Sequence, residues 1–424
     1  MFVYTIKDGD TIEKLSREFN VSLDDLLLAN GITEDAVFPV GTAVVIPTDY
    51  GRHIIEKGDS LYSIALKYGT TVENLLRLNP NLKPPYIIYP NDYIIVPSYA
   101  EKPRIDTNGY CYTSISDETL DKTLPYLTYI SIFSYNLLPD GNLKGIDDER
   151  IIRHAREQNV APFMVVTNIG DKGNFDSELV KTFLTTPDAY EAFIDGIPTY
   201  LKERGYLGIN IDFEYVYAEN REDYNNFIKL LSQRLSSEGL MLSTALAPKL
   251  SDTQKGILYE GHDYAFLGEW CDWIAIMTYE WGYIAGPPLA VAPKSEVEKV
   301  IRYTTSVIPS EKILLGMPNY GYDWTLPFER GTKAQTVNLT RAIQLAREVG
   351  ANIEYNTSSN APFFTYNANG RDHIVWFDDA RSIMSRFELV NKYDLGGISF
   401  WTINNYFAPT FAVLQNMFEV NKLL

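Results

Sequence analysis

The stretch GINIDFEYV, residues 208–216, places polar side chains at every second position. Asn210, Asp212 and Glu214 alternate there with large apolar residues, and an alternation with a period of two is typical of a β-strand. The three polar groups therefore share one face of the predicted strand. If both faces are buried, two carboxyl groups lie inside the protein, where burying a charge is costly and usually serves chemistry.

Seven further apolar runs accompany this strand, and stretches with helical periodicity lie between several of them. The eight predicted strands cover residues 105–112, 129–135, 161–167, 208–215, 240–248, 273–281, 312–322 and 396–403. Strands that alternate with helices predict a parallel sheet covered by helices, and eight strands predict an α/β fold, the (β/α)8 TIM barrel. An open, doubly wound sheet is the alternative.

The segment from Thr325 to about Phe377 is longer than one helix requires and contains strand-like runs around NANGRD. We therefore expect a small inserted subdomain, residues 325–377, before the last barrel helix. In a barrel both faces of a strand are covered, one by helices and one by the barrel interior. Asn210, Asp212 and Glu214 are then expected to point inward at a candidate active site, with Glu214 nearest the C-terminal end. A structural polar network is the alternative interpretation.

The composition excludes several classes of function. The 424 residues are 45% hydrophobic and 22% charged, which suits a large α/β domain with smaller modules. A net charge of -18 argues against nucleic acid and against an anionic membrane surface as partners. The 30 Tyr, 20 Phe and 6 Trp residues are a heavy aromatic load, and exposed aromatic faces are what sugar rings stack on.

Neither a metal nor a cofactor is expected. Cys111 and Cys271 form no metal-binding or redox motif, so we expect two buried thiols rather than a disulfide. The 4 histidines show no HExxH pattern, and no phosphate-binding loop is present. No apolar run is long enough to predict a membrane span. The start MFVYTIKDGDT lacks the basic and apolar segments of a cleaved signal peptide.

The N-terminal part of the chain contains a repeat. VYTIKDGDTIEKLSREFNVSLDDLLLAN aligns with HIIEKGDSLYSIALKYGTTVENLLRLN at a constant offset of 49. Each unit predicts a strand, two helices and a second strand. Two copies are too few for a solenoid, so we expect two small tandem modules over residues 1–48 and 50–98. A stiff linker over 99–104 and the barrel domain over 105–424 follow.

Both units resemble LysM domains in their GD[TS] turn, the Asn after the second helix and the closing [IV]P. LysM domains bind the N-acetylglucosamine-containing backbones of peptidoglycan and chitin, so the resemblance implies a glycan partner. It places the glycan against the loop after the first strand and the loop after the second helix. The residues at these places are Asp10, Thr11 and Asn30 in the first unit and Asp59, Ser60, Asn79 and Pro80 in the second. Modules that merely pack on the rest of the chain are the alternative.

The remaining chain resembles glycoside hydrolase family 18, the chitinase-like enzymes, over about residues 105–424. GINIDFE is similar to the family's DGxDxDxE signature, MTYEW (277–281) to its Met-x-Tyr-Asp strand, GMPNYGYDW to its seventh strand and GGISFW to its eighth. With its two LysM units, the chain resembles the spore cortex-lytic N-acetylglucosaminidases of the SleL type. Those enzymes act on cortex peptidoglycan during germination, which implies a location in the bacterial spore.

The resemblance implies a retaining mechanism in which the substrate's own 2-acetamido oxygen attacks the anomeric carbon. Glu214 would act as general acid and then as general base. Asp212 would orient the acetamido group, Tyr279 would donate its hydroxyl to the acetamido oxygen, and Trp401 would form an apolar floor under the sugar. Further substrate contacts are implied for other residues of the matching motifs: Met277, Glu280, Trp281 and Tyr320.

Three departures from the family pattern accompany this resemblance. Leu207 and Asn210 replace the first two Asp residues of the signature, and Glu280 stands where the family usually has Asp. TNIG at 167–170 is a weak match to the family's Gly-rich third strand. Asn210 is able to hydrogen-bond Asp212 but not to ionise, so Asp212 is expected to titrate without the like-charge repulsion of a carboxylate dyad.

Three functions stay open at this point. A peptidoglycan N-acetylglucosaminidase, expected to act as a monomer, is favoured. A chitinase is the second, because the catalytic machinery and the LysM units both tolerate chitin. The third is a non-catalytic glycan-binding protein on a hydrolase scaffold, although loss of the acid Glu marks such relatives and Glu214 is present.

Overall fold

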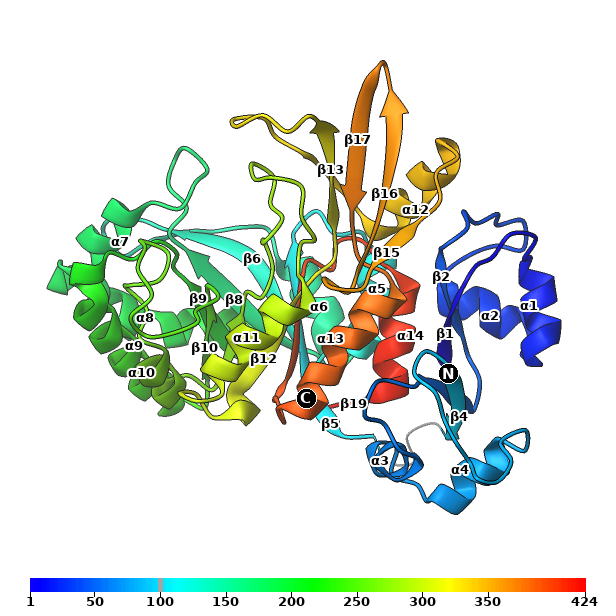
Figure 1. The fold of residues 1–424 in the computed structure, drawn as a ribbon. Helices are drawn as coiled ribbons and strands as arrows, with labels where there is room; N and C mark the ends of the chain where they lie inside the picture. The colour runs from blue at the N-terminus through cyan, green and yellow to red at the C-terminus, as the bar shows by residue number, and fades with distance from the viewer. Residues whose placement is uncertain (98–101) are drawn as a thin grey trace.

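The computed structural model describes residues 1–97 and 102–424. Figure 1 shows two small N-terminal modules beside a large barrel that is covered by helices. The predicted linker over 99–104 lies partly outside the described residues. Residue 98, at the predicted end of the second module, also lies outside them.

Each N-terminal module has the order strand, helix, helix, strand, which confirms the predicted βααβ pattern. The first module consists of β1 (Phe2–Thr5), α1 (Ile12–Phe19), α2 (Leu23–Asn30) and β2 (Ala43–Ile46). The second consists of β3 (Tyr50–Ile54), α3 (Leu61–Lys67), α4 (Val72–Leu78) and β4 (Tyr93–Pro97). In both modules the two strands pair antiparallel.

Eight parallel strands form the barrel, at the places that the sequence predicts. They are β5 (Arg104–Tyr112), β6 (Tyr129–Leu137), β8 (Ala161–Thr167), β9 (Gly208–Asp212), β10 (Met241–Leu246), β11 (Trp273–Ile276), β12 (Ile313–Pro318) and β18 (Gly397–Trp401). The sheet closes because β5 pairs with both β18 and β6. This closure excludes the open, doubly wound sheet. Two short strands are added to this sheet. β7 (Leu143–Lys144) pairs antiparallel with β6, and β19 (Glu419–Val420) pairs parallel with β5.

The alternation in β9 separates two layers, as predicted. Ile209 and Ile211, with Phe213 beyond the strand, belong to the large apolar core between the strands and the helices. Asn210 faces the opposite way and contacts the interior residue Tyr110. The barrel interior is filled largely by aromatic side chains, which include Tyr110, Tyr129, Phe163 and Trp273. A filled interior leaves room for a ligand only at the ends of the strands.

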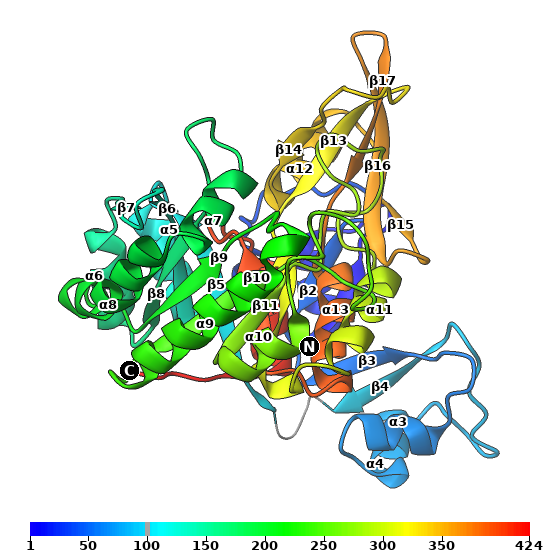
Figure 2. The ribbon, with the colours of Figure 1, turned by 90° about the vertical axis from the view of Figure 1, so that its left-hand side faces the viewer.

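Helices surround the barrel (Figures 1 and 2). They are α5 (Asp117–Thr123), α6 (Glu149–Glu157), α7 (Ser177–Leu184), α8 (Pro187–Arg204), α9 (Arg221–Ser236), α10 (Tyr264–Trp270), α11 (Lys294–Thr304), α13 (Ala380–Lys392) and α14 (Ala408–Met417). Short 3-10 turns lie at Leu124–Tyr126, Ala218–Asn220 and Ser310–Lys312. A search of the described residues finds no helix with the length and apolar character of a membrane span. Cys111 and Cys271 are buried and free, as predicted.

A subdomain inserted between β12 and α13 rises above the barrel, and its longest hairpin forms the top of the molecule in Figures 1 and 2. Its five-stranded antiparallel sheet and one helix are β13 (Gly321–Leu326), β14 (Gln335–Val337), α12 (Leu339–Glu348), β15 (Glu354–Asn356), β16 (Ala361–Ala368) and β17 (Arg371–Trp376). This sheet starts at Gly321, before the expected start at Thr325. The single strand predicted over 312–322 is therefore two strands, β12 and β13, with a break at Asn319 and Tyr320.

The first module is packed tightly against the barrel. Helix α2 lies on α14, and Gly31 approaches Ala408 so closely that an added Cβ would lie 2.9 Å from the Ala408 Cβ. Arg381 of α13 donates a hydrogen bond to the Gly41 carbonyl oxygen at 3.0 Å. The N–H group of Ile353 in the inserted subdomain donates to the Val40 carbonyl oxygen at 2.8 Å. The first module is thus fixed to both the barrel and the inserted subdomain.

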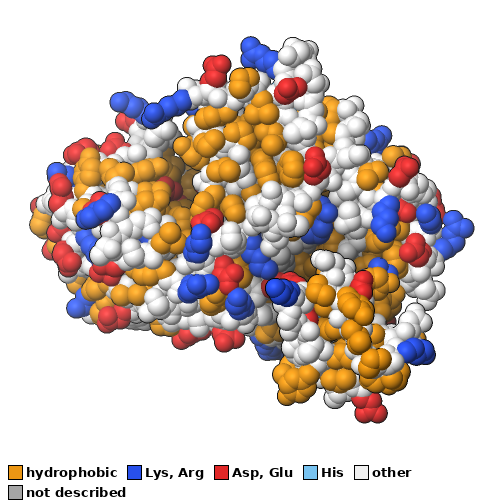
Figure 3. Space-filling view, in the orientation of Figure 1, with side chains coloured by type: hydrophobic (Ala, Val, Ile, Leu, Met, Phe, Trp, Pro, Cys, Tyr) orange, Lys and Arg blue, Asp and Glu red, His pale blue; other side chains and the backbone are white. Residues whose placement is uncertain are grey.

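The second module projects away from the barrel (Figure 2). Arg52 joins it to the first module by stacking its guanidinium 4.3 Å from the centre of the Phe2 ring and 4.4 Å from that of Tyr93. Lys67 forms an ion pair with Glu388 of α13 at 3.7 Å. Hydrophobic side chains gather on the exposed surface of this module (Figure 3), and its large exposed residues are Ile54, Tyr62, Leu66, Tyr86, Ile87, Tyr89 and Tyr93.

Candidate active site

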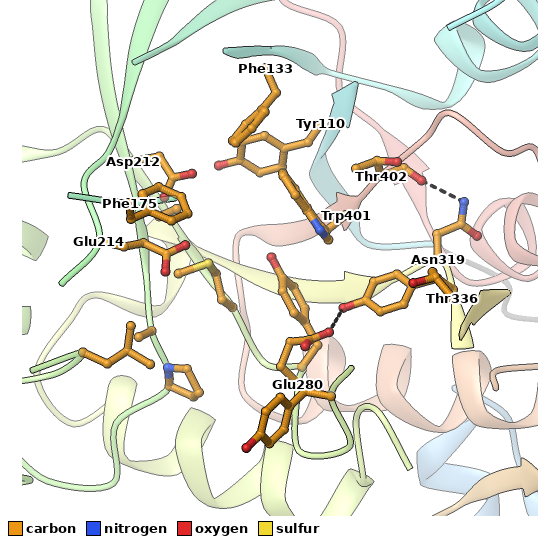
Figure 4. A pocket seen from close by; sticks show the side chains of 18 of the residues that line it. Tyr110, Phe133, Phe175, Asp212, Glu214, Glu280, Asn319, Thr336, Trp401 and Thr402 are labelled. Carbon is orange, nitrogen blue, oxygen red and sulfur yellow. Dashed lines mark hydrogen bonds between the residues drawn. The ribbon is translucent and has the colours of Figure 1, made fainter. Parts of the chain in front are cut away.

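A cavity of about 690 Å³ opens at the C-terminal ends of the barrel strands. Asp212 is the last residue of β9, and Glu214 follows it two positions later. Both line the cavity, and Figure 4 shows them on one side of it, across from Trp401. The structure therefore brings the two predicted carboxyl groups together where barrel enzymes hold their active sites.

The surroundings of the two carboxyl groups favour their protonated forms. Burial raises the pKa of Asp212 above its ordinary value. Burial also raises the pKa of Glu214, and the nearby charges of Asp212 and Glu280 raise it further. Glu214 is thus able to hold a proton at a pH at which an exposed glutamate has lost it. Such a group can donate a proton at neutral pH.

Asn210 lies beneath the cavity and is completely buried. Its Oδ1 accepts a hydrogen bond from the Tyr110 hydroxyl at 3.1 Å, and its Nδ2 donates to Ser243 Oγ at 2.9 Å. Throughout the described chain, no hydrogen bond joins Asn210 to Asp212, although the Asn210 amide is able to form one. The reason is that the amide is engaged by the neighbouring strands β5 and β10. Asn210 carries no charge, so the electrostatic neighbour of Asp212 is the carboxyl group of Glu214.

Aromatic side chains form the wall that faces the carboxyl groups. The Trp401 ring, at the end of β18, meets the rings of Phe133 and Tyr110 edge-on at centroid distances of 5.0 and 5.5 Å. Tyr279 and Met277 also line the cavity, as the sequence predicts. Burial raises the pKa of Tyr279 well above its ordinary value, so its hydroxyl stays protonated. Within residues 1–97 and 102–424 this hydroxyl has no hydrogen-bond partner, which leaves it free to donate to a ligand.

Glu280 lies at the mouth of the cavity with its backbone in the left-handed region, at φ 71°. Its Oε1 accepts hydrogen bonds from the hydroxyl groups of Tyr320 and Tyr322, the latter at 2.9 Å. Desolvation raises the pKa of Glu280, while both tyrosine hydroxyls lower it. Trp281, predicted to contact substrate, is not among the described residues that line the cavity. Its backbone N–H group pairs with the Val291 carbonyl oxygen instead, and its ring packs against the large core.

Sequence reasoning missed the side chains that hold the turn after β9. Three consecutive carbonyl oxygens, those of Phe213, Glu214 and Tyr215, contact His262 Nε2 at 2.9 Å, Asn168 Nδ2 at 2.9 Å and Ser177 Oγ at 2.7 Å. Burial lowers the pKa of His262 to about 4, so the imidazole is neutral. The only sequence signal was TNIG, which includes Asn168 and matches the family's third strand weakly. Contacts between such distant parts of the chain leave no periodic pattern.

The predicted glycan-binding residues of the two modules have other partners. The buried amide of Asn30 bonds to the backbone of Leu26 and Val45, and Asn79 bonds in the same way to Leu75 and Ile95. Asn30 therefore ties its helix to the closing strand and does not offer its side chain to a glycan, contrary to expectation. The remaining side chains stabilise the turn before the first helix or cap that helix, and they are those of Asp10, Thr11, Asp59 and Ser60.

Comparison with known proteins agrees with this geometry. The family profile described as "Glycosyl hydrolases family 18" matches residues 107–405, and the LysM domain profile matches residues 4–47 and 53–97. A "Cortical fragment-lytic enzyme" of Bacillus subtilis (strain 168) is 35% identical over 430 residues, which cover 100% of this chain and 99% of that protein.

Solved structures resemble the chain as well. The crystal structure of the Bacillus cereus spore cortex-lytic enzyme SleL has a TM-score of 0.90 and 34% identity, and the match covers 99% of this chain and 98% of that one. A chitinase from Chromobacterium violaceum ATCC 12472 has a TM-score of 0.69 and 25% identity over 74% of this chain and 99% of that one.

Proposed function

Because this chain belongs to the glycosyl hydrolases of family 18, we propose that it hydrolyses the glycan strands of bacterial spore cortex peptidoglycan during germination. The bond is the β-1,4 bond that follows N-acetylglucosamine. One observation carries the proposal: the buried Asp212 and the half-buried Glu214 lie together in the cavity of a barrel whose full-length relative is a cortical fragment-lytic enzyme. The similarity to that relative extends over 100% of this chain, so it includes the barrel and the two N-terminal modules.

The reaction proceeds in two steps and retains the anomeric configuration. In the first step Glu214 gives its proton to the oxygen of the leaving sugar, and the acetamido oxygen of the N-acetylglucosamine attacks C1 as the glycosidic bond breaks. The raised pKa of Glu214 suits this role as acid. In the second step the Glu214 carboxylate takes a proton from a water molecule. The water oxygen attacks C1 and opens the oxazolinium ion, and the proton transfer regenerates the acid form of Glu214.

Asp212 and Tyr279 act on the acetamido group. Asp212 accepts a hydrogen bond from its N–H and stabilises the positive charge of the oxazolinium ion. This role is supported by Asp212 Oδ1, a buried oxygen without a hydrogen-bond partner in the described residues. Tyr279 donates its hydroxyl to the acetamido oxygen. The ring of Trp401 provides the floor under the sugar, with Met277 beside it in the cavity lining.

Glu280 and Tyr320 bind hydroxyl groups of the sugar at the mouth of the cavity, where both reach the cavity surface. The N-terminal modules hold the glycan strand and raise its effective concentration at the site. The exposed rings of Tyr62, Tyr86 and Tyr89 on the second module offer stacking surfaces for sugars. The protein acts as a monomer associated with the spore.

The proposal is tested by digesting purified cortex peptidoglycan and reducing the products with borohydride. Mass spectrometry then identifies the new reducing ends, with Glu214→Gln as the matched control. New ends in the form of N-acetylglucosaminitol, absent with Glu214→Gln, are the expected result. Muramitol ends would show a different bond specificity. Absence of any new end would favour a binding protein or another glycan.

Hydrolysis of chitin is the second candidate function, favoured by the structural match to a chitinase. That match covers 74% of the chain, less than the match to the cortex-lytic enzyme. Chitin is therefore included as a parallel substrate. Release of soluble sugar from chitin at a rate comparable to that from cortex would favour a chitinase.

A further inference from the structure

The strand that carries the two carboxyl groups ends before the second of them. The parallel pairing of β8 with β9 runs as far as Thr167 and Asp212. Glu214 lies beyond this ladder. In the part of the chain that the structure describes, its carboxyl group also accepts no hydrogen bond from a neighbour. The direction of the Glu214 side chain is therefore set by the conformation of its main chain and by the residues that hydrogen-bond to that main chain.

Asn168 holds the main chain of Glu214 with both ends of its side-chain amide. The Glu214 N–H donates to Asn168 Oδ1 at 2.9 Å, and Asn168 Nδ2 donates to the Glu214 carbonyl oxygen at 2.9 Å. Asn168 is completely buried, so water does not compete for these bonds. The amide takes the place of a backbone peptide and continues the pairing of β8 with β9 past the point where the strands end.

The same amide also fixes the loop that follows β8. Asn168 Nδ2 donates to the Asp176 carbonyl oxygen at 3.0 Å, and the Asp176 N–H donates to the Asn168 carbonyl oxygen at 2.8 Å. Between these two residues, Phe175 reaches the wall of the cavity and faces Tyr215, with the ring centres 6.4 Å apart. One buried side chain thus links the acid to the cavity wall beside it.

We propose that Asn168 is a positioning residue for the reaction: it aims the Glu214 carboxyl group at the leaving oxygen by clamping the Glu214 backbone. The inference rests on the proposed role of Glu214 as general acid. A displacement of about 1 Å at a reacting group can cost on the order of 10²-fold in rate. Because Asn168 is not among the described residues that line the cavity, losing the clamp should slow the chemical step without weakening substrate binding.

The test compares Asn168→Ala with Asn225→Ala in the full chain. Asn225 is a buried amide on α9, it does not line the cavity, and it serves as the matched control for removing a buried side chain. Asn168→Asp is the second variant, since it keeps the size of the side chain and removes the donor to the Glu214 carbonyl oxygen. Circular dichroism and thermal melting establish that each variant folds.

Two substrates are used, cortex peptidoglycan fragments and the 4-nitrophenyl β-glycoside of N,N′-diacetylchitobiose. Nitrophenol leaves without protonation, so its release depends less on the acid than release of a sugar does. We expect Asn168→Ala to lower kcat on cortex fragments on the order of 10²-fold, with KM close to that of the wild type. The loss on the nitrophenyl substrate should be much smaller. Asn225→Ala should keep the wild-type ratio of the two rates.

Two results would overturn the inference. One is a loss that appears in KM rather than in kcat, and the other is an equal loss with Asn168→Ala and Asn225→Ala. Glu214→Gln in the same assay separates this failure from failure of the proposed function. If Glu214→Gln is inactive on cortex and Asn168→Ala behaves as Asn225→Ala does, the positioning role of Asn168 is refuted and the proposed function stands. If Glu214→Gln keeps full activity, the proposed mechanism itself is wrong.

Discussion

Replacing Asn30 with alanine should destabilise the first module without removing a contact to a ligand. The Asn30 amide makes three hydrogen bonds of 2.8 Å each, to the Leu26 carbonyl oxygen, the Val45 carbonyl oxygen and the Val45 N–H. A typical intramolecular hydrogen bond contributes about 1 kcal/mol net, so the three together contribute about 3 kcal/mol. This free energy corresponds to a change on the order of 10²-fold in the opening equilibrium of β2.

Hydrogen exchange followed by mass spectrometry measures this opening directly. We expect exchange in peptides that cover β2 to accelerate on the order of 10²-fold in Asn30→Ala. Asn79→Ala should do the same to β4, because Asn79 makes the equivalent three bonds in the second module. Asn81→Ala is the control, since this exposed residue of the second module makes no such contacts in the described chain. If Asn30→Ala exchanged like the wild type but bound insoluble peptidoglycan less well, the amide would serve the ligand, and the structural reasoning would be refuted.

Three further predictions concern the charges in the cavity. The charge of Glu280 raises the pKa of Glu214, so Glu280→Gln should move the alkaline limb of the kcat–pH profile to lower pH. An unmoved limb would show that Glu280 does not affect the pKa of the acid. Asn210→Asp should place a second carboxyl group about 6.6 Å along the strand from Asp212, where like charges raise one pKa of the pair. A pH–activity profile that overlays the wild-type profile would contradict this. Glu214→Gln should gain stability over the wild type as pH rises above the ordinary value of 4.5. Over that range the folded carboxyl group keeps a proton that the unfolded one has lost, so wild-type stability falls with rising pH until the raised pKa is passed. Urea unfolding across this pH range measures the difference in free energy of unfolding between Glu214→Gln and the wild type. A difference that stayed constant with pH would contradict the prediction.

Local patterns were sufficient to predict the architecture. The period of two in residues 208–216 places apolar side chains toward the helices and polar ones toward the barrel interior, because consecutive side chains of a strand point to opposite faces. The repeat at an offset of 49 predicts two βααβ modules, since each copy carries its own turn and cap residues. Both patterns depend on residues that are close in sequence, and both are confirmed.

Features that depend on distant contacts were not predictable in this way. Asn30 and Asn79 were assigned to glycan binding, but their partners lie 15 and 16 residues further along the chain. Asn168 was not singled out, because its partner Glu214 is 46 residues away. Trp281 was assigned to the cavity since it follows Glu280 in the motif. The left-handed backbone at Glu280 breaks the alternation there, so the direction of Trp281 could not be inferred from it.

The polar groups around the cavity fall into two sets, and the difference between them points to the reacting atoms. Asn210 and Asn168 are buried with their amides engaged by neighbouring strands and loops. Asp212 Oδ1 has no partner, and it is the only fully buried side-chain oxygen without one among the described residues that line the cavity. Leaving a buried acceptor unpaired costs about 1–3 kcal/mol. A protein that satisfies the deeper amides but leaves this oxygen open keeps that interaction for a ligand. A donor such as the acetamido N–H of a bound sugar would complete it.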